Sequence, residues 1–361
     1  MLRRSIMLGG IGLLDRAMAK PLTKDSVRSA DALIERSIAS GEVRAAALYV
    51  RQGSFTFQRG YGKATSPESV FLLASITKPM TATGVMILVE RGKLSLSDPV
   101  RKHIPEFSGG GRDAITIRHL LTHTSGLPDQ LSENIDLRKR HAPLKDFVAI
   151  TCKTPLLFKP GEKVSYQSMG LLLAAEIAER TTRKPFREFL REELFQPIGM
   201  TQTSLGLGGR KIPSTMQSQV EHAPAIYGTS DNDWNWNSLY WRELGAPWGG
   251  AHSNVHDIAL LMSMFVKPDG RVLRKETAEQ MVTLQTKGLN EPWGLGWMLD
   301  PAKLGKACSP RTFGHWGSTG TIAWADRATG VVCVLLTTRP ADQSRSGLLG
   351  PVSDAVSQAA A

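Results

Sequence analysis

The chain has 361 residues, of which 41% are hydrophobic, so it can bury a large core in one large domain or in two intergrown lobes. Its formal charge is +11, but the basic residues are scattered and show neither a zinc-finger spacing nor a basic heptad repeat, so we expect a solvated basic surface and no nucleic-acid partner. No apolar run is long enough to span a bilayer, and the three cysteines lie far apart, which argues against a disulfide framework.

The first twenty residues carry features of an export signal. Arg3 and Arg4 precede a short apolar stretch, and the small residues Ala-Met-Ala that follow are typical of a cleavage site, as in signals of the twin-arginine type. Asp15 and Arg16 interrupt the segment just before that site. Two interpretations stay open: the protein is exported, for example to the periplasm, if residues 1–19 are a signal, and it is cytoplasmic otherwise.

The first two thirds of the chain predict a hairpin followed by helices. Two β-rich runs within residues 43–62 are joined by a turn at Gly53. A helix is expected over residues 75–91, ended by Gly92. Further helices are expected in residues 116–129 (a short helix and a turn), 144–151, 169–182 and 185–195. Residues 201–250 are rich in Gly, Ser and Trp and indicate irregular structure.

The last third predicts one helix, then strands. Residues 254–266 are helical in pattern, with Asn254 as a suitable N-cap. The expected strands lie at residues 293–299, 312–317, 319–327 and 330–338, and a final helix is expected over 349–360. Strands at both ends of the chain with helices between them indicate one sheet built from the two termini. We expect a sheet lobe from residues 21–74 and 250–361, with a helical lobe inserted over residues 75–249.

Ser75 and Lys78 form the one Ser-x-x-Lys motif of the chain. Pro79 places a helix start close to Ser75, because proline is tolerated in the first turn of a helix and damages its interior. Residues i and i+3 share a helix face, so Lys78 can lie beside the Ser75 hydroxyl and act as its base. Alternatively, Ser75 only caps the helix and Lys78 is solvated. The motif alone is weak evidence, since about one would occur by chance in a chain this long.

Two later segments add chemistry to this motif. Tyr166 lies in a loop just ahead of a predicted helix, and a tyrosine beside a lysine can shuttle a proton between a serine and a leaving group. His315-Trp316-Gly317 lies on a predicted edge strand, where Gly317 would let a substrate backbone approach closely. The backbone N–H groups of Ser318 and Ser75 could together form an oxyanion hole.

The combination resembles the serine β-lactamase and penicillin-binding-protein superfamily, and most closely its class C-like branch, which includes carboxylesterases and D-amino-acid peptidases. The resemblance runs from about residue 26 to 338. It rests on these motifs, which follow the family's order and typical separations: SITK, LSLSDPV, TIRHLLTHTSGL, PGEKVSYQS, FREFLREELFQPIGM, PWGGAHSNVHDIA and GHWGSTG.

The resemblance implies a mixed α+β fold of the β-lactamase/transpeptidase type. An antiparallel β-sheet flanked by helices would pack beside an inserted all-helical lobe, with the site between them. It also implies Ser75 as the acylated nucleophile, and Lys78 and Tyr166 as the pair that handles the proton. No metal or cofactor is implied.

Two positions depart from the family pattern. The second motif usually ends in Asn and here ends in Ser168, which lacks an amide. The third motif is Lys-Thr-Gly in true lactamases, and here it is His315-Trp316-Gly317. Histidine is mostly neutral near pH 7, so these changes weaken recognition of an anionic β-lactam. We expect Ser168 and residues 315–317 to contact a neutral or apolar ester, or a small amide.

Two further features have competing interpretations. The pairs His119/His123 and His252/His256 have the spacing of metal ligands on a helix, but without the glutamate of the His-Glu-x-x-His pattern we expect them to bond backbone groups at turns. Aromatic residues concentrate in residues 227–250, where the polar neighbours suit a surface loop more than a core. Either they are packing residues, or some of them, such as Trp236 and Trp241, wall an acyl pocket.

The sequence therefore predicts a serine hydrolase that forms a covalent acyl-enzyme on an ester or small amide, in the manner of a carboxylesterase. A D-amino-acid peptidase, a DD-carboxypeptidase or a weak β-lactamase is the second hypothesis, and an acyltransferase is a further one. A non-catalytic binding protein on the same fold is the alternative from another class. The expected partner is a small ester, amide or peptide substrate, and the oligomeric state stays open.

Overall fold

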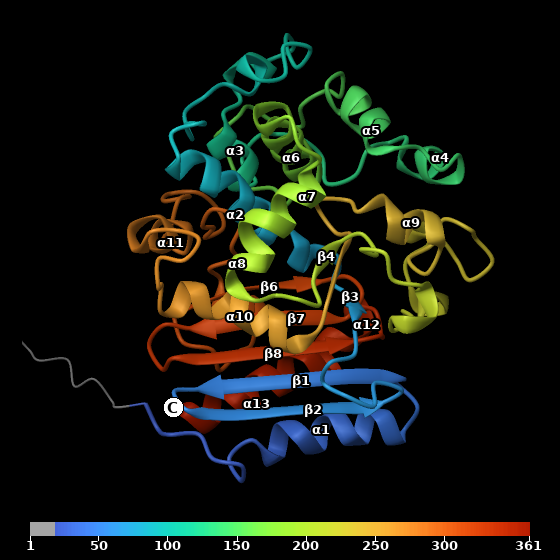
Figure 1. Ribbon diagram of the computed structural model, residues 1–361, viewed down its shortest axis with the longest axis vertical. Coiled ribbons are helices and arrows are strands. Elements are labelled where there is room, and N and C mark those ends of the chain that lie inside the picture. Colours follow the sequence, from blue (N-terminus) through green and yellow to red (C-terminus); the bar gives the residue numbers. More distant parts are fainter. Residues whose placement is uncertain (1–18) are drawn as a thin grey trace, which may run out of the picture.

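The computed structural model describes residues 19–361 and contains a five-stranded antiparallel sheet with helices on both faces (Figure 1). The strands are β1 (Ala45–Gln52), β2 (Phe55–Gly62), β6 (Thr312–Gly317), β7 (Thr321–Asp326) and β8 (Val331–Thr337), in the order β2-β1-β8-β7-β6. Because β1 pairs with β8, the two ends of the chain meet in one sheet, as the sequence predicts. The predicted export signal lies almost wholly outside the described residues.

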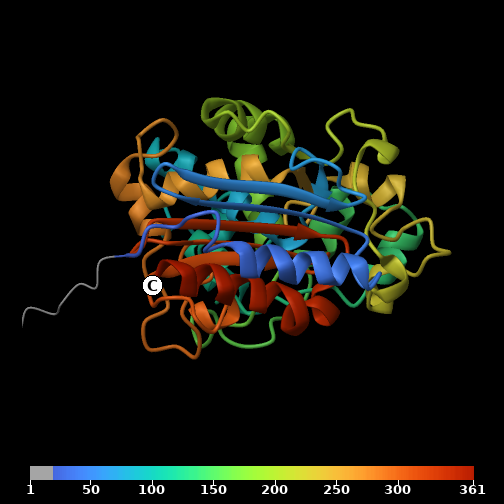
Figure 2. The same ribbon diagram turned by 90° about the horizontal axis from the view of Figure 1, so that it is seen from below.

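The sheet is apolar on both sides because helices cover both faces. Alternate residues of a strand face opposite sides. Ala46 and Leu48 of β1 belong to the core shared with α1 (Arg28–Ala39) and α13 (Gly350–Ala360), whereas Ala45 and Ala47 belong to the core shared with α10 (Val255–Val266). The helices α1 and α13 run side by side against one face (Figure 2). This explains why β1 reads as a continuous apolar run.

The remaining helices gather on the α10 side of the sheet (Figure 1). They are α2 (Thr77–Glu90), α3 (Ile117–Leu121), α4 (Asn134–Lys139), α5 (Leu144–Thr151), α6 (Met169–Thr182), α7 (Phe186–Leu190), α8 (Gln196–Ile198), α9 (Leu239–Leu244) and α11 (Lys275–Met281). The exception is the short α12 (Ala341–Ser344), whose Ala341 belongs to the core shared with α1 and α13. A small sheet β3-β5-β4 joins β3 (Phe71–Leu72), β5 (Ala251–Ser253) and β4 (Ser204–Leu205). The helix α2 is buried from Thr77 to Leu88 and packs against α6, so it forms the centre of this region. The division into two lobes at the expected residues stays a prediction.

Most local predictions agree with the structure. The hairpin turns at Gly53, whose φ of 57° is in the left-handed region that favours glycine. The helices expected over residues 144–151 and 169–182 have those bounds. The helix expected over 185–195 is α7 followed by a π-helical turn at Arg191–Phe195. No helix within residues 19–361 has the length and apolar character needed to cross a membrane.

The strand expected over residues 293–299 is wrong. Only single bridges form here, between Trp293 and Met298 and between Met298 and Gly314. Gly296 has a φ of 80°, which interrupts an extended run, and its N–H donates to the Leu121 carbonyl at the end of α3. The segment therefore touches the sheet only at the Met298–Gly314 bridge to β6 and bonds to a helix end at Gly296, so it does not form a strand.

Removing the cap of α10 should destabilise the protein. The Asn254 side chain accepts a hydrogen bond from the Asp257 N–H at 2.8 Å and donates to Glu68 at 2.6 Å. We expect Asn254→Ala to lower the free energy of unfolding by about 1–2 kcal/mol, measured by urea denaturation. The control Asn254→Ser keeps a capping oxygen and should lose less. Equal stability of all three proteins would contradict the assigned cap.

Candidate active site

Ser75 lies in a tight 3₁₀ turn, Ala74–Ile76, between β3 and α2. Ala74 has a φ of 48°, which is uncommon for a residue other than glycine and indicates a turn held by its surroundings. The hydroxyl of Thr77 helps to hold it, because it donates to the Ala74 carbonyl at 2.7 Å and accepts from the Ala251 N–H at 3.0 Å. The half-buried Ser75 is thereby presented at the positive end of the α2 dipole.

Lys78 lies directly against Ser75. Its Nζ is 2.9 Å from Ser75 Oγ and 2.9 Å from the Trp248 carbonyl oxygen. The side chain is buried, so the solvated alternative does not hold in this structure. Burial lowers the pKa of Lys78 to about 8, partly opposed by the negative charge of Asp129. A substantial fraction of the amine is therefore neutral near pH 8 and able to accept a proton.

Tyr166 completes a compact group with these two residues. The Lys78 ammonium lies 4.7 Å from the centroid of the Tyr166 ring. Burial raises the pKa of the phenol well above its usual range, and the charge of Asp129 acts in the same direction, while the nearby Ser75 hydroxyl opposes them. At neutral pH Tyr166 is therefore an O–H donor rather than a phenolate.

The edge strand β6 is fastened to the turn that carries Ser75. A Cβ atom on Gly317 would lie 2.2 Å from the Leu73 carbonyl oxygen, so the close approach at this glycine is that of the protein's own backbone. Thr319 Oγ1 donates to the Leu72 carbonyl and Thr321 Oγ1 to the Leu73 carbonyl, each at 2.8 Å. The backbone of β6 is thus held beside Ser75.

His315 is buried within this assembly. Its Nδ1 is 2.7 Å from the Trp316 carbonyl oxygen. Burial, with the charge of Lys78 as the second cause, lowers the pKa of His315 to about 3. The imidazole is therefore neutral over the physiological range and supplies no positive charge to the site.

Ser75 opens into a cavity of about 180 Å³. Its lining includes several of the residues selected from the sequence: Ser75, Tyr166, Ser168, Trp236, Trp241, Trp316 and Ser318. Lys78, His315 and Gly317 lie behind this lining rather than in it. Cavities of about 520 and 500 Å³ elsewhere contain none of Ser75, Lys78 and Tyr166. The small cavity is the one with the reactive groups.

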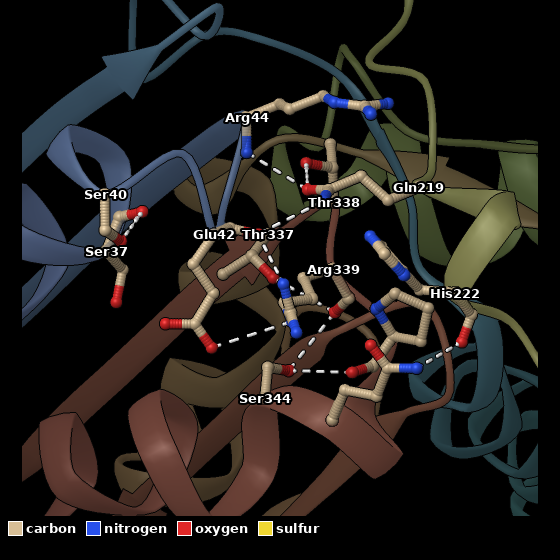
Figure 3. A network of polar contacts seen from close by, with 12 residues as sticks. Ser37, Ser40, Glu42, Arg44, Gln219, His222, Thr337, Thr338, Arg339 and Ser344 are labelled. Carbon is tan, nitrogen blue, oxygen red and sulfur yellow. Dashed lines mark hydrogen bonds and ion pairs between the residues drawn. The ribbon is translucent and has the colours of Figure 1, made fainter.

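The tryptophans of residues 227–250 are buried, although the sequence suggested a surface loop. Gln219 holds the preceding part of this segment against the ends of β1 and β8 (Figure 3). Its side-chain oxygen accepts from the Arg44 N–H and from Thr338 Oγ1, each at 3.0 Å, and its side-chain nitrogen donates to the Glu42 carbonyl at 3.1 Å. These bonds join Gln219, which precedes the aromatic segment in the sequence, to the ends of β1 and β8.

The family model described as Beta-lactamase matches residues 30–352. The chain belongs to the beta-lactamase family. This confirms the family and the mixed α+β fold expected from the motifs, and the family supports the expected serine hydrolase class.

Individual relatives are distant. Protein flp of Staphylococcus aureus (strain MRSA252) is 30% identical over 201 residues, which cover 53% of this chain and 40% of flp, so the chain spans less than half the length of that relative. The fold matches a family VIII carboxylesterase, with a TM-score of 0.75, 19% identity and coverage of 95% of this chain and 98% of that one. It also matches the D-amino acid amidase of Ochrobactrum anthropi SV3, with a TM-score of 0.73, 22% identity and coverage of 93% and 98%.

Within this beta-lactamase-family site, Asp129 was not found by sequence reasoning. Ser168, which stands where the family usually has asparagine, donates its hydroxyl hydrogen bond to Asp129 Oδ1 at 2.6 Å. The cavity lining also includes Arg138 and Tyr227, which no motif singled out, and Trp248, which lies in the motif PWGGAHSNVHDIA but was assigned no role. The available signal was position, because Asp129 lies two residues after the motif TIRHLLTHTSGL, which ends at Leu127.

All four residues of the histidine pairs were expected to bond to backbone groups, and three of them do. His119 accepts from the Thr116 N–H, His123 accepts from the Gln167 N–H at 3.1 Å, and His252 Nδ1 is 2.9 Å from the Gly206 oxygen. His256 is exposed beside Asp257. Residues 19–361 contain no cluster of three or more His, Cys, Asp or Glu side chains suited to a metal ion.

The depressed pKa of Lys78 can be measured directly. In protein labelled with ¹³C-lysine, one side-chain resonance should titrate near pH 8, while solvated lysines titrate near their usual value of about 10.4. The Lys78→Arg variant assigns the resonance, since only that signal should disappear. A Lys78 resonance that titrates with the solvated lysines would contradict the buried, partly neutral amine.

Proposed function

We propose that the protein is a serine hydrolase that cleaves an ester, or a small amide, through a covalent acyl-enzyme on Ser75. The observation that carries the proposal is the 2.9 Å contact between Ser75 Oγ and the buried Nζ of Lys78. A serine hydroxyl is a weak nucleophile unless an adjacent base accepts its proton. A solvated lysine would be almost fully protonated at neutral pH, and burial is what makes this one a usable base.

The remaining groups suit the steps that follow. Lys78 in its neutral form accepts the Ser75 proton as Oγ attacks the substrate carbonyl carbon. The negative charge that develops on the carbonyl oxygen is stabilised by the N–H groups of Ser75 and Ser318, assisted by the α2 dipole. Tyr166, a neutral phenol, donates a proton to the leaving group and is reprotonated through Lys78. A water molecule then attacks the acyl carbon and releases the acid.

A carboxylesterase-like activity is our first choice of reaction. The third motif lacks the lysine that would hold a β-lactam carboxylate, and His315 is neutral. Trp236 and Trp241 offer aromatic walls, and the cavity of about 180 Å³ suits a short acyl group. Amide cleavage by a D-amino-acid peptidase is the second candidate, because the same groups serve an amide and a D-amino acid amidase has this fold. A purely non-catalytic role is disfavoured by the close packing of Ser75, Lys78 and Tyr166.

Replacing the nucleophile tests this proposal. Wild-type protein should hydrolyse p-nitrophenyl esters faster than nitrocefin or D-alanyl amides, and Ser75→Ala should lower kcat/KM by at least about 10³-fold. A fluorophosphonate probe should label the wild type at Ser75 and leave Ser75→Ala unlabelled. Product analysis with an added alcohol separates hydrolysis from acyl transfer. Undiminished turnover by Ser75→Ala would refute the nucleophile, and efficient nitrocefin turnover would overturn the preference for esters.

The pH dependence identifies the base. Burial lowers the pKa of Lys78, so the active neutral amine is the minor form below about pH 8 and the major form above it. We therefore expect kcat/KM for a neutral ester to rise with pH and to level off above about pH 8, measured by initial rates at constant ionic strength. A rise centred near pH 6.5 would instead indicate a histidine, and neither His123 nor His315 titrates there.

A further inference from the structure

The lining of the Ser75 cavity contains a buried arginine. Arg138, on α4, lines the same cavity as Ser75 and is 0% exposed. Its guanidinium carbon lies 3.7 Å from the centroid of the Trp241 ring and 5.6 Å from that of Tyr227. Nε donates to Asn134 Oδ1 at 3.3 Å, but Nη1 has no hydrogen-bond partner among residues 19–361. Arg138 is thus positioned mainly through the face of its guanidinium.

A second buried arginine, Arg242, has hydrogen-bond partners for all its side-chain nitrogens, unlike Arg138. Arg242 is also 0% exposed, yet each of its side-chain nitrogens donates to a neutral acceptor. The acceptors are the Trp236 carbonyl, Thr215 Oγ1, the Met216 carbonyl and Asn237 Oδ1, at 2.5–3.0 Å. Each N–H-bearing nitrogen of the structural arginine, Arg242, therefore has an acceptor, whereas Nη1 of Arg138 is left without one.

An unpaired buried charge is costly, and an anion would offset the cost. Burial lowers the pKa of Arg138 to about 10, so the group stays positive at neutral pH, and no carboxylate is among the groups that shift it. Aromatic rings hold a guanidinium by its faces and leave its in-plane N–H groups available. Those N–H groups form the fork that fits a carboxylate in two parallel hydrogen bonds.

Neighbouring groups in the cavity favour the same occupant. Trp241 Nε1, a second N–H donor in the lining, also lacks a partner within the described part of the chain. Asp129 is the one acidic residue of the lining, and it is bonded to Ser168 rather than to Arg138. Asp129 therefore does not supply the carboxylate that would pair with Arg138.

We propose that Arg138 binds a carboxylate of the substrate while the scissile carbonyl lies at Ser75, so that the preferred substrates are esters or amides that also carry an acid group. This inference rests on the proposed hydrolase activity and narrows its substrate class. The positive charge that lactamases place in the third motif is absent from β6, and here α4 supplies one from another wall. The neutral ester expected from the sequence follows from the third motif alone, and the position of Arg138 in the cavity lining changes that expectation.

Matched esters test this inference. We would compare p-nitrophenyl monoadipate with p-nitrophenyl heptanoate, which have chains of similar length, and an ester of 4-hydroxybenzoate, which places the carboxylate on the leaving group. Wild type should prefer a carboxylate-bearing ester by kcat/KM, with the Ser75→Ala rate subtracted as background. Arg138→Met should lower the ratio of kcat/KM for that ester to kcat/KM for the heptanoate ester by about 10- to 100-fold.

Three controls separate the outcomes. Arg140→Met removes an exposed charge two residues away and should leave the selectivity unchanged, which excludes a general effect of net charge. Thermal unfolding of Arg138→Met should show an unchanged or higher Tm, because a buried unpaired charge is lost. Arg138→Lys should keep part of the preference. No wild-type preference for either acidic ester, or equal losses on acidic and neutral esters, would overturn the inference. Loss of heptanoate turnover in Ser75→Ala tests the hydrolase proposal separately.

Discussion

The contact between Ser75 and Lys78 requires two conditions that normally conflict. The amine must be removed from water, or it stays protonated, and it must touch a hydroxyl that faces a cavity. The structure meets both by placing Lys78 on the most buried helix, α2, behind the cavity lining, and by giving its Nζ the Trp248 carbonyl as a second partner. Ser75 lies one turn earlier, at the end of the helix that reaches the cavity. Burial and access are thus divided between two neighbouring residues.

Everything around this contact comes from distant parts of the chain. The turn with Ser75 lies against the β6–β7 hairpin, about 240 residues later, through hydrogen bonds from Thr319 and Thr321 to the Leu72 and Leu73 carbonyls. The aromatic wall comes from residues 227–250, and Gln219, which precedes that segment, bonds to residues at the ends of β1 and β8. Pairing of β1 with β8 brings the two ends of the chain into one sheet. A rigid sheet edge and a buried helix therefore set the distances that the proposed chemistry needs.

Burial strongly affects the charge of the ionisable side chains in and behind the cavity lining. His123 and His315 are ionisable, but burial holds their pKa values below the usual range, so they act as neutral packing and hydrogen-bonding groups. Burial also lowers the pKa values of Lys78 and Arg138, but the consequences differ. In the proposed mechanism a lysine with a pKa near 8 can exchange a proton with Ser75 and Tyr166, whereas an arginine with a pKa near 10 keeps its charge at neutral pH, as the proposed anion binding requires.

The sequence by itself determined most local elements, the family and the placing of Lys78 beside Ser75, because these depend on spacings and motifs that can be read along the chain. Helices such as residues 144–151 and 169–182 follow from their periodicity, and the Ser-x-x-Lys contact follows from one helical turn. Only the tertiary structure decided the fate of residues 293–299, the burial of the tryptophans and the presence of Asp129 and Arg138 in the cavity. These depend on which distant groups exclude water from a site, and no local pattern encodes that exclusion.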